Sequence, residues 1–352
     1  MLVSRFHLPC RIPAIDAAAQ EAARARHALL TKPPGSLGRL EELGVQLAGI
    51  FANPRPSVAR KVVFVMAGDH GVAVEGVSAY PSQVTVQMVH NFLSGGAAIN
   101  VLARQAGARV LVVDVGVAEE LAPQPGLILR KVARGTRNLA KEPAMTRQQA
   151  EEAIQVGVDL ACAESDRGMD LVAAGEMGIG NTTASAAIVS VLAGVPVSKV
   201  TGRGTGLDEP GLARKVAVIE RALALHQPDP KDPVDVLSKV GGLEIGALAG
   251  LMLGAASRRV PVVIDGFISG AAALLAVALA PELQSFLLAA HQSAEPGHAV
   301  ALSHLRLRPM LELGLRLGEG TGAVLAFHLI EAAARVLDEM ATFAEAGVSA
   351  QS

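Results

Sequence analysis

A single glutamate set among glycines near the end of the chain has the residue type and surroundings that suit catalysis. Glu319 lies between Gly318 and Gly320, and a largely apolar run, 323–330, follows. Glycines let the backbone come close to a ligand, and burial beside an apolar helix would raise the pKa of the carboxyl group. We therefore expect Glu319 to point into a cleft as a functional acid. The motif alone fits an exposed acid in a glycine-rich turn equally well.

A second glycine-rich segment, 175–183, lies where a strand is expected to give way to a helix. Gly178 and Gly180 permit a tight turn, and Asn181 or Thr182 can cap the helix that follows. The free N–H groups of such a helix start form an anion site, for which phosphate is the natural ligand. The segment has neither the Walker nor the GxGxxG pattern, so it does not indicate a nucleoside triphosphate. A plain helix cap is the alternative interpretation.

A third segment, 201–208, alternates three glycines with Arg203 and Thr205, and Lys215 lies on the helix expected just beyond. Cationic and hydroxyl groups on a glycine-rich loop favour a second wall of the anion site. A solvated loop with a charged rim would look the same.

Polar residues also follow other expected strands. Asp69 and His70 are adjacent after the first strand, and the segment 80–83 comes shortly after them. Such a pair can carry acid–base chemistry, but adjacent side chains at a strand end point apart, which favours a role in shaping the loop. Asp265 and the segment 293–298 are weaker signals that we expect to line the pocket.

Composition excludes several classes of function. The 352 residues are 51% hydrophobic with a net charge of −2, and no basic stripe alternates with aromatics, so a nucleic-acid partner is not expected. The histidines lack metal-binding spacing, and we expect no metal and no cofactor. Cys10 and Cys162 give no disulfide framework, which indicates reduced thiols in the cytoplasm. The N-terminus lacks the apolar core of a secretory signal, and the uncharged runs 181–198 and 266–281 are interpreted as buried helices.

Near-continuous apolar strands alternate with helices along the middle of the chain. This pattern predicts an α/β fold with an open parallel sheet covered by helices on both faces. Four strands end in glycine plus an acid and the fifth at His291, and in such sheets the ligand crevice lies at the carboxyl ends of the strands. A hairpin is expected around 127–132, within a polar loop. The expected strands are 62–66, 110–113, 171–174, 260–264 and 286–290; the expected helices are 13–30, 37–51, 82–93, 97–105, 146–162, 182–192, 211–226 and 243–256.

Five motifs in order along the chain carry a family resemblance. They are 32–38 (KPPGSLG), 67–71 (AGDHG), 175–183 (GEMGIGNTT), 202–206 (GRGTG) and 317–322 (LGEGTG). Together they resemble the nicotinate-nucleotide–dimethylbenzimidazole phosphoribosyltransferases, which make the lower-ligand nucleotide of cobalamin. The resemblance spans nearly the whole chain, and no motif residue departs from it.

The resemblance implies that nicotinate mononucleotide donates its ribosyl phosphate to 5,6-dimethylbenzimidazole, giving α-ribazole 5′-phosphate and nicotinate. It also implies a homodimer, with Glu319 as the general base and Glu176 and Lys215 at further active-site positions. The implied division is a Rossmann-like α/β domain, 56–305, and a small helical domain made from an N-terminal arm, 1–55, and a C-terminal segment, 306–352.

We assign the remaining predicted site residues to the two substrates. Glu176 would be repelled by a phosphate, so we expect it near the ribose or the entering base, as a reserve base. The phosphate and ribose are expected to contact Gly178, Gly180, Asn181, Thr182, Thr183, Arg203, Gly204, Lys215, Asp265 and Ser293. The aromatic base is expected to contact Asp69, His70, Tyr80, Ser82, Gln83, Leu315 and Leu317.

Some alternatives stay open from the sequence. The same chemistry could use another azole, a purine or a phenol as acceptor, and pocket shape would decide among them. A non-catalytic binder of nucleotides or azoles is a different class, and the presence of both Glu176 and Glu319 argues against it. The apolar helices at 243–256 and 266–278 either supply a dimer interface or cover the sheet.

Overall fold

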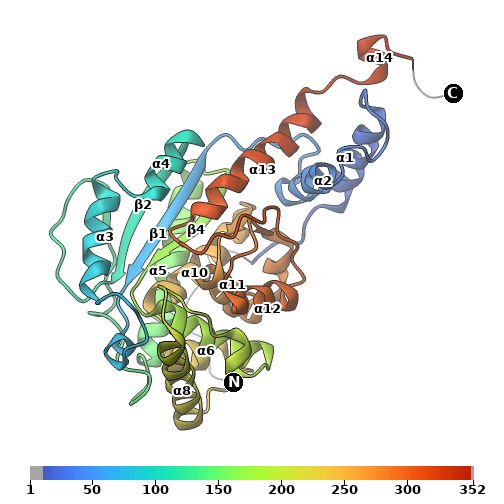
Figure 1. The fold of residues 1–352 in the computed structure, drawn as a ribbon. Coiled ribbons are helices and arrows are strands. Elements are labelled where there is room, and N and C mark those ends of the chain that lie inside the picture. The colour runs from blue at the N-terminus through green and yellow to red at the C-terminus, as the bar shows by residue number, and fades with distance from the viewer. Residues whose placement is uncertain (1–10, 350–352) are drawn as a thin grey trace.

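The computed structural model describes residues 11–349, which form a six-stranded, all-parallel sheet in the order β3-β2-β1-β4-β5-β6 (Figure 1). The predicted parallel α/β fold and its five strands are confirmed. The additional strand, β3, lies in the segment that was expected to form a hairpin. The hairpin prediction is wrong because β3 pairs parallel to β2, with Leu127 opposite Val112. The strands are β1 Lys61–Gly68, β2 Ala108–Gly116, β3 Leu127–Leu129, β4 Leu171–Met177, β5 Val262–Ile264 and β6 Leu287–Ala289.

Alternation along β1 divides the core between the two faces of the sheet. Val62, Phe64 and Met66 belong to one buried cluster, whereas Val63 and Val65 belong to the other. Every residue of β1 is buried, as expected of a central parallel strand covered on both faces. The first face packs mainly against α5 Arg147–Asp166, α6 Asn181–Ala193, α9 Pro233–Val240, α10 Leu243–Ser257, α11 Phe267–Leu279 and α12 Pro296–His304; the second packs against α2 Arg39–Phe51, α3 Gln83–Leu93, α4 Ala98–Gln105 and α13 Thr321–Glu339.

The two apolar helices considered for an interface cover the sheet instead. Every residue of α10 is buried, and α11 is buried from Phe267 to Ala276. Their small residues allow a very close approach: a side chain at Gly250 would lie 1.8 Å from the Ile154 carbonyl oxygen of α5. Within residues 11–349, no helix combines the length and the hydropathy that crossing a membrane requires.

Helices from both ends of the chain lie together at one side of the molecule (Figure 1). The arm helices α1 Ala17–Leu29 and α2 pack against the C-terminal half of α13, and Ala23, Val45 and Leu337 share a small core. Helix α1 begins after Asp16, whose carboxylate accepts from Ala19 N (2.8 Å), so the expected start at Pro13 is wrong. The division into domains at 55 and 305 remains a prediction. The other elements are α7 Val197–Val200, α8 Glu209–His226, α14 Phe343–Ala346 and the 3₁₀ helices η1 Gly71–Glu75 and η2 Pro281–Phe286.

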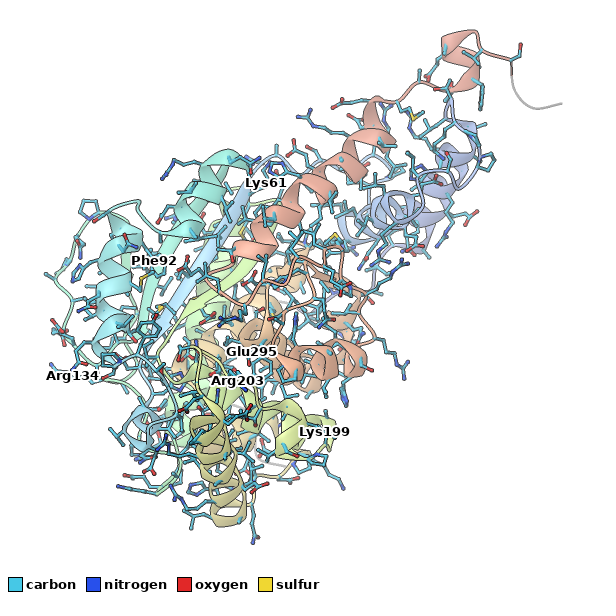
Figure 2. The ribbon with its side chains drawn as sticks, viewed as in Figure 1. Lys61, Phe92, Arg134, Lys199, Arg203 and Glu295 are labelled. Carbon is cyan, nitrogen blue, oxygen red and sulfur yellow. The ribbon has the colours of Figure 1, made fainter. Side chains whose placement is uncertain are left out.

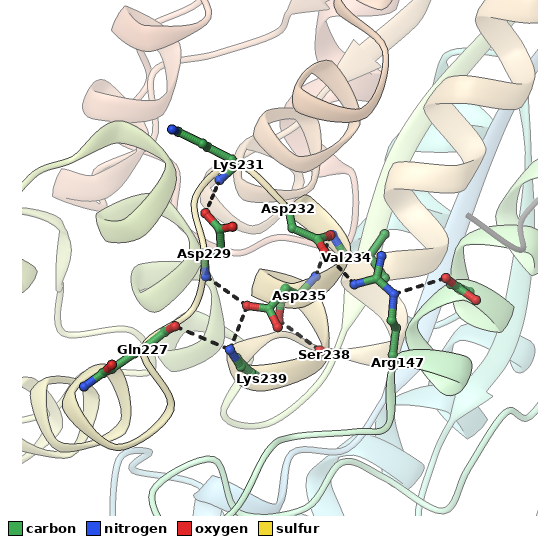
Figure 3. Close-up of polar contacts among 10 residues, drawn as sticks. Arg147, Gln227, Asp229, Lys231, Asp232, Val234, Asp235, Ser238 and Lys239 are labelled. Carbon is green, nitrogen blue, oxygen red and sulfur yellow. Dashed lines mark hydrogen bonds and ion pairs between the residues drawn. The ribbon is translucent and has the colours of Figure 1, made fainter. Parts of the chain in front are cut away.

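A polar network at the start of α9 fixes the connection from α8 (Figure 3). Asp232 caps α9 by accepting from Val234 N and Asp235 N, each at 3.1 Å, and pairs with Arg147 of α5 at 2.7 Å. Lys239 pairs with Asp235 at 2.8 Å one turn later. The charge-assisted bond between Asp232 and Arg147 holds the start of α9 against α5. Helix α8 carries Lys215 toward the strand ends.

Candidate active site

A cleft of about 360 Å³ opens at the carboxyl ends of β4, β5 and β6. It lies beside the point where the strand order reverses between β1 and β4, which is the usual ligand position in open parallel sheets. Ten of the predicted site residues line it: Tyr80, Glu176, Gly178, Asn181, Thr182, Gly204, Asp265, Ser293, Leu317 and Glu319.

Glu319 is held in a conformation that ordinary residues rarely adopt. Its φ is +64°, and the flanking Gly318 and Gly320 have φ of +86° and +92°. The side chain is 5% exposed, and Oε2 accepts a hydrogen bond from Ile99 N (3.2 Å) at the start of α4. Burial, with a contribution from Asp265, raises the pKa of Glu319, and the bond from Ile99 opposes this rise. Backbone strain of this kind is typical of functional sites.

Asp265 positions the glutamate loop. Its carboxylate accepts from Gly320 N (3.2 Å) and Ala323 N (2.9 Å), which are orphan donors at the start of α13. Burial raises the pKa of Asp265, and His291, 3.8 Å away, opposes the rise. The sequence assigned Asp265 to the phosphate or ribose, whereas its hydrogen bonds serve the helix that follows Glu319.

Glu176 lies at the end of β4 beside the glutamate loop. Its Oε2 accepts from the Asn181 side-chain amide, and a side chain at Gly318 would lie 2.3 Å from its Oε1. Burial, together with the negative charges of Asp265, Glu244 and Glu319, raises the pKa of Glu176 to about 8. The raised pKa of Glu176 favours its protonated form near neutral pH, which makes Glu319 the better candidate for a base.

Lys215 supplies a buried positive charge beneath the helix start at Asn181. Its Nζ donates to Thr182 Oγ1 (2.7 Å) and to the Gly202 carbonyl oxygen (3.3 Å). Burial lowers the pKa of Lys215 to about 8, against the attraction of Glu295. Helix α6 begins after Gly180, whose φ is +98°. The helix start and the lysine together favour an anion at this end of the cleft.

The residues after β1 shape the site from behind. His70 Nε2 lies 2.7 Å from Glu244 Oε1 in a fully buried pair, and Asp69 Oδ2 accepts from Ala118 N (2.8 Å). Burial acts to lower the pKa of His70, but Glu244 outweighs it and the pKa is raised. Neither residue lines the cleft, and both have partners within the fold, which favours the shaping role. Contact of Asp69 or His70 with the aromatic base stays a prediction.

Arg203 also differs from its expected position. It donates to the Leu207 carbonyl oxygen (2.8 Å) and pairs with Glu209, and it is not among the residues that line the cleft. Figure 2 labels its position on the ribbon. A role for Arg203 in the anion wall stays a prediction. Lys215 lies just behind the lining. The other predicted residues that do not line the cleft are Gly180, Thr183, Ser82, Gln83 and Leu315.

The cleft lining also includes residues that were not predicted as site residues. Met88 and Met177 supply apolar walls, and His291, Glu295 and Arg316 supply polar ones. His291 ends the fifth expected strand and Glu295 lies in a weak strand-end segment, so both carried a usable signal. Among residues 11–349, no group of three or more histidine, cysteine, aspartate or glutamate side chains is placed to hold a metal ion.

Comparison with known proteins decides the family. The model of a phosphoribosyltransferase family matches residues 12–348. The chain belongs to this family. It is similar to the nicotinate-nucleotide–dimethylbenzimidazole phosphoribosyltransferases of Roseiflexus sp. (strain RS-1), at 62% identity over 96% of each chain, and Geobacter sulfurreducens, at 58% over 96% of each. The crystal structure of CobT from Thermus thermophilus superposes with a TM-score of 0.92 at 52% identity, covering 95% of this chain and all of that one. The predicted resemblance is confirmed.

Proposed function

We propose that this chain transfers the 5-phosphoribosyl group of nicotinate mononucleotide to 5,6-dimethylbenzimidazole, with Glu319 as the general base. The products are α-ribazole 5′-phosphate and nicotinate, for the nucleotide loop of cobalamin. Relatives that bear this activity in their names match nearly the full chain at about 60% identity. The site offers the groups that this reaction needs.

The reaction requires one proton to be removed. The C1′–N bond of the donor breaks and its electron pair returns to the pyridinium nitrogen, so nicotinate leaves without needing an acid. One nitrogen of the acceptor attacks C1′, and the other nitrogen loses its proton. A carboxylate within hydrogen-bond reach is sufficient to accept this proton. Glu319 lies beside Leu317 and Met177 in the cleft lining, which suits a flat aromatic acceptor.

The different pKa shifts of Glu176 and Glu319 support different roles for the two residues. Because the pKa of Glu176 is raised to about 8, this side chain can donate a hydrogen bond to a ribose hydroxyl at neutral pH. Glu319 is ionised more readily, and its raised pKa makes it a stronger base than an exposed glutamate. The negative charge of Glu319 also stabilises positive charge developing on the sugar in the transition state.

The donor phosphate is placed at the start of α6. Thr182 and Gly204 line this end of the cleft, and Lys215 lies directly beneath Thr182. This arrangement keeps the phosphate near the lysine and the helix start, and directs C1′ toward the carboxylates. Holding both substrates in this geometry supplies a large part of the rate enhancement in bimolecular transfers.

One assay tests the proposal. Purified protein is mixed with nicotinate mononucleotide and 5,6-dimethylbenzimidazole, and nicotinate and α-ribazole 5′-phosphate are separated by chromatography. We expect the two products in equal amounts. Nicotinate without the nucleotide would contradict transfer to this acceptor, and replacing it with a purine or a phenol would then test the other acceptors. Binding without turnover would indicate a non-catalytic binder.

The assembly and location of the enzyme extend this proposal. We expect a homodimer in the cytoplasm, supported by the family resemblance and by Cys162, which is a free thiol. Because α10 and α11 are buried against the sheet, the dimer must use other surfaces. Sedimentation at micromolar concentration tests this expectation, and a monomer alone would contradict it.

A further inference from the structure

The backbone of Gly204 is held from two sides by residues far away in the sequence. Its N–H donates to Glu295 Oε1 (2.9 Å), and its carbonyl oxygen accepts from Arg316 Nη1 (3.1 Å). Gly204 has a φ of +53°, and a side chain there would lie 2.9 Å from Thr182 Oγ1. The position therefore requires glycine, and its conformation is fixed by its neighbours.

The rest of the 202–206 loop joins other walls of the cleft. Thr205 Oγ1 accepts from Ala79 N (2.8 Å), next to Tyr80, and the Gly202 carbonyl oxygen accepts from Lys215 Nζ (3.3 Å). Three glycines in five residues give this loop little stiffness of its own. These contacts with four separate segments therefore determine where the loop lies.

Arg316 connects this loop to the proposed base. It lies three residues before Glu319 on the same connection, lines the cleft, and is the one lysine or arginine among the described lining residues. None of the ion pairs among residues 11–349 involves Arg316, so the Gly204 carbonyl oxygen is its fixed partner. The sugar-phosphate end and the base end of the cleft thus meet at one peptide unit.

We propose that Arg316 is a positioning residue that couples the two substrate sites, so that binding of the sugar phosphate strengthens binding of the acceptor. A sugar phosphate held at Thr182 and Gly204 adds a contact to the 202–206 loop and restricts its motion around the position in which the Gly204 carbonyl oxygen accepts from Arg316. Arg316 then holds the Glu319 connection more firmly where the acceptor binds. The second ligand meets a connection whose motion is already restricted, and the coupling is reciprocal. The inference rests on the proposed function.

Calorimetry with D-ribose 5-phosphate and 5,6-dimethylbenzimidazole tests the coupling. Ribose 5-phosphate has no leaving group at C1′, so no transfer occurs. In the parent protein, saturating ribose 5-phosphate is expected to lower the Kd of the benzimidazole by about five-fold or more, the usual range for coupled sites. We call the ratio of the benzimidazole Kd without ribose 5-phosphate to the Kd with it the coupling factor. In Arg316→Ala the coupling factor is expected to fall to about one. Arg316→Gln, which keeps an amide donor for Gly204, should retain part of it.

Matched variants separate the coupling from general damage. Arg308→Ala removes another exposed arginine from the same C-terminal connection and should leave the factor unchanged. Glu295→Gln keeps an acceptor for Gly204 N and should retain the coupling factor even where its affinity for ribose 5-phosphate changes, whereas Glu295→Ala should reduce the factor. Circular dichroism of each variant checks the fold.

Two results would overturn the proposal. The first is a coupling factor near one in the parent protein, which would mean that the two substrate sites are independent. The other is an undiminished factor in Arg316→Ala, even if that variant binds ribose 5-phosphate more weakly, because Arg316 would then be an anion ligand alone. Failure of the transferase proposal shows itself separately, as absence of nicotinate release by the parent.

Discussion

The carboxyl ends of the six strands carry two groups of acids that look alike in sequence and differ in structure. On the β1–β2 side, each acid has a cation or a backbone donor of its own. His70 pairs with Glu244 at 2.7 Å, and Asp114 lies 3.1 Å from Lys131 Nζ while also accepting from Val117 N. Neither Glu244 nor Asp114 lines the cleft, so we call this the closed side of the sheet edge.

On the cleft side, Glu176 and Glu319 each accept a hydrogen bond from an uncharged donor, and neither forms an ion pair within residues 11–349. Asp265, 3.8 Å from His291, contributes to the raised pKa values of both glutamates, whereas Lys215 donates to Thr182. An acid after a strand is structural when the fold pairs it with a cation away from the cleft. It is a candidate for chemistry when it lies in the cleft with only an uncharged donor.

The largest expected effect comes from removing the charge of the proposed base. Glu319→Gln should lower kcat by about two to four orders of magnitude, the usual size of a general-base contribution, because the amide cannot accept the proton. Steady-state kinetics with both substrates measure this. Glu312→Gln, an exposed glutamate of the same connection, is the control. Near-normal kcat in Glu319→Gln would make Glu176 the next candidate.

Breaking the closed side should instead lower stability. Glu244→Ala leaves His70 buried without its partner. The free energy of unfolding, measured with urea at pH 6, should fall by about 3–5 kcal/mol. Because the pKa of His70 is raised in the folded state, its ionic stabilisation is full below its ordinary pKa and is lost as the pH rises through the folded value. The difference between parent and variant should therefore shrink above neutral pH.

The control for this stability effect is an exposed ion pair. Glu339→Ala, in a surface pair with Arg335, should cost less than about 1 kcal/mol. A loss in Glu244→Ala that is equally small, or that grows with pH, would contradict the role of the His70–Glu244 pair.

The smallest effect concerns the proton on Glu176. A carboxyl whose folded pKa is raised to about 8 binds a proton in the folded state that the unfolded chain has released. Between pH 6 and pH 7, the free energy of unfolding of the parent should therefore fall by about 1.4 kcal/mol relative to that of Glu176→Gln. Urea unfolding of both proteins at the two pH values measures this difference, and groups common to both cancel. A difference independent of pH would show that Glu176 is already ionised.

The sequence predicted the parts of the fold that local patterns determine. Five strands, the helices between them and the edge where polar residues gather follow from apolar runs and their ends. Glu319 was identified because two glycines flank it. The segment of β3 was expected in a hairpin, and its parallel pairing was not predicted, because three residues do not reveal their direction of pairing.

Side-chain partners could not be predicted because they come from distant segments. Glu244 lies 174 residues from His70, and Arg316 lies 112 residues from Gly204. Arg203 was assigned to the anion site from its loop, but Glu209, six residues later, attracts it outward. Charge and spacing placed these residues near the right region, and only the packing of the chain decided which of them face the cleft.

Helix α13 joins the chemistry to the far side of the molecule. Its first turn is capped by Asp265 and follows Glu319, and Lys61 at the start of β1 pairs with Glu331 along its length. Its last turns contact α1 and α2 (Figure 1). A continuous 19-residue helix is a stiff rod about 28 Å long. Because α13 is one continuous helix, it links α1 and α2 rigidly to the loop that carries the proposed base, about 28 Å away.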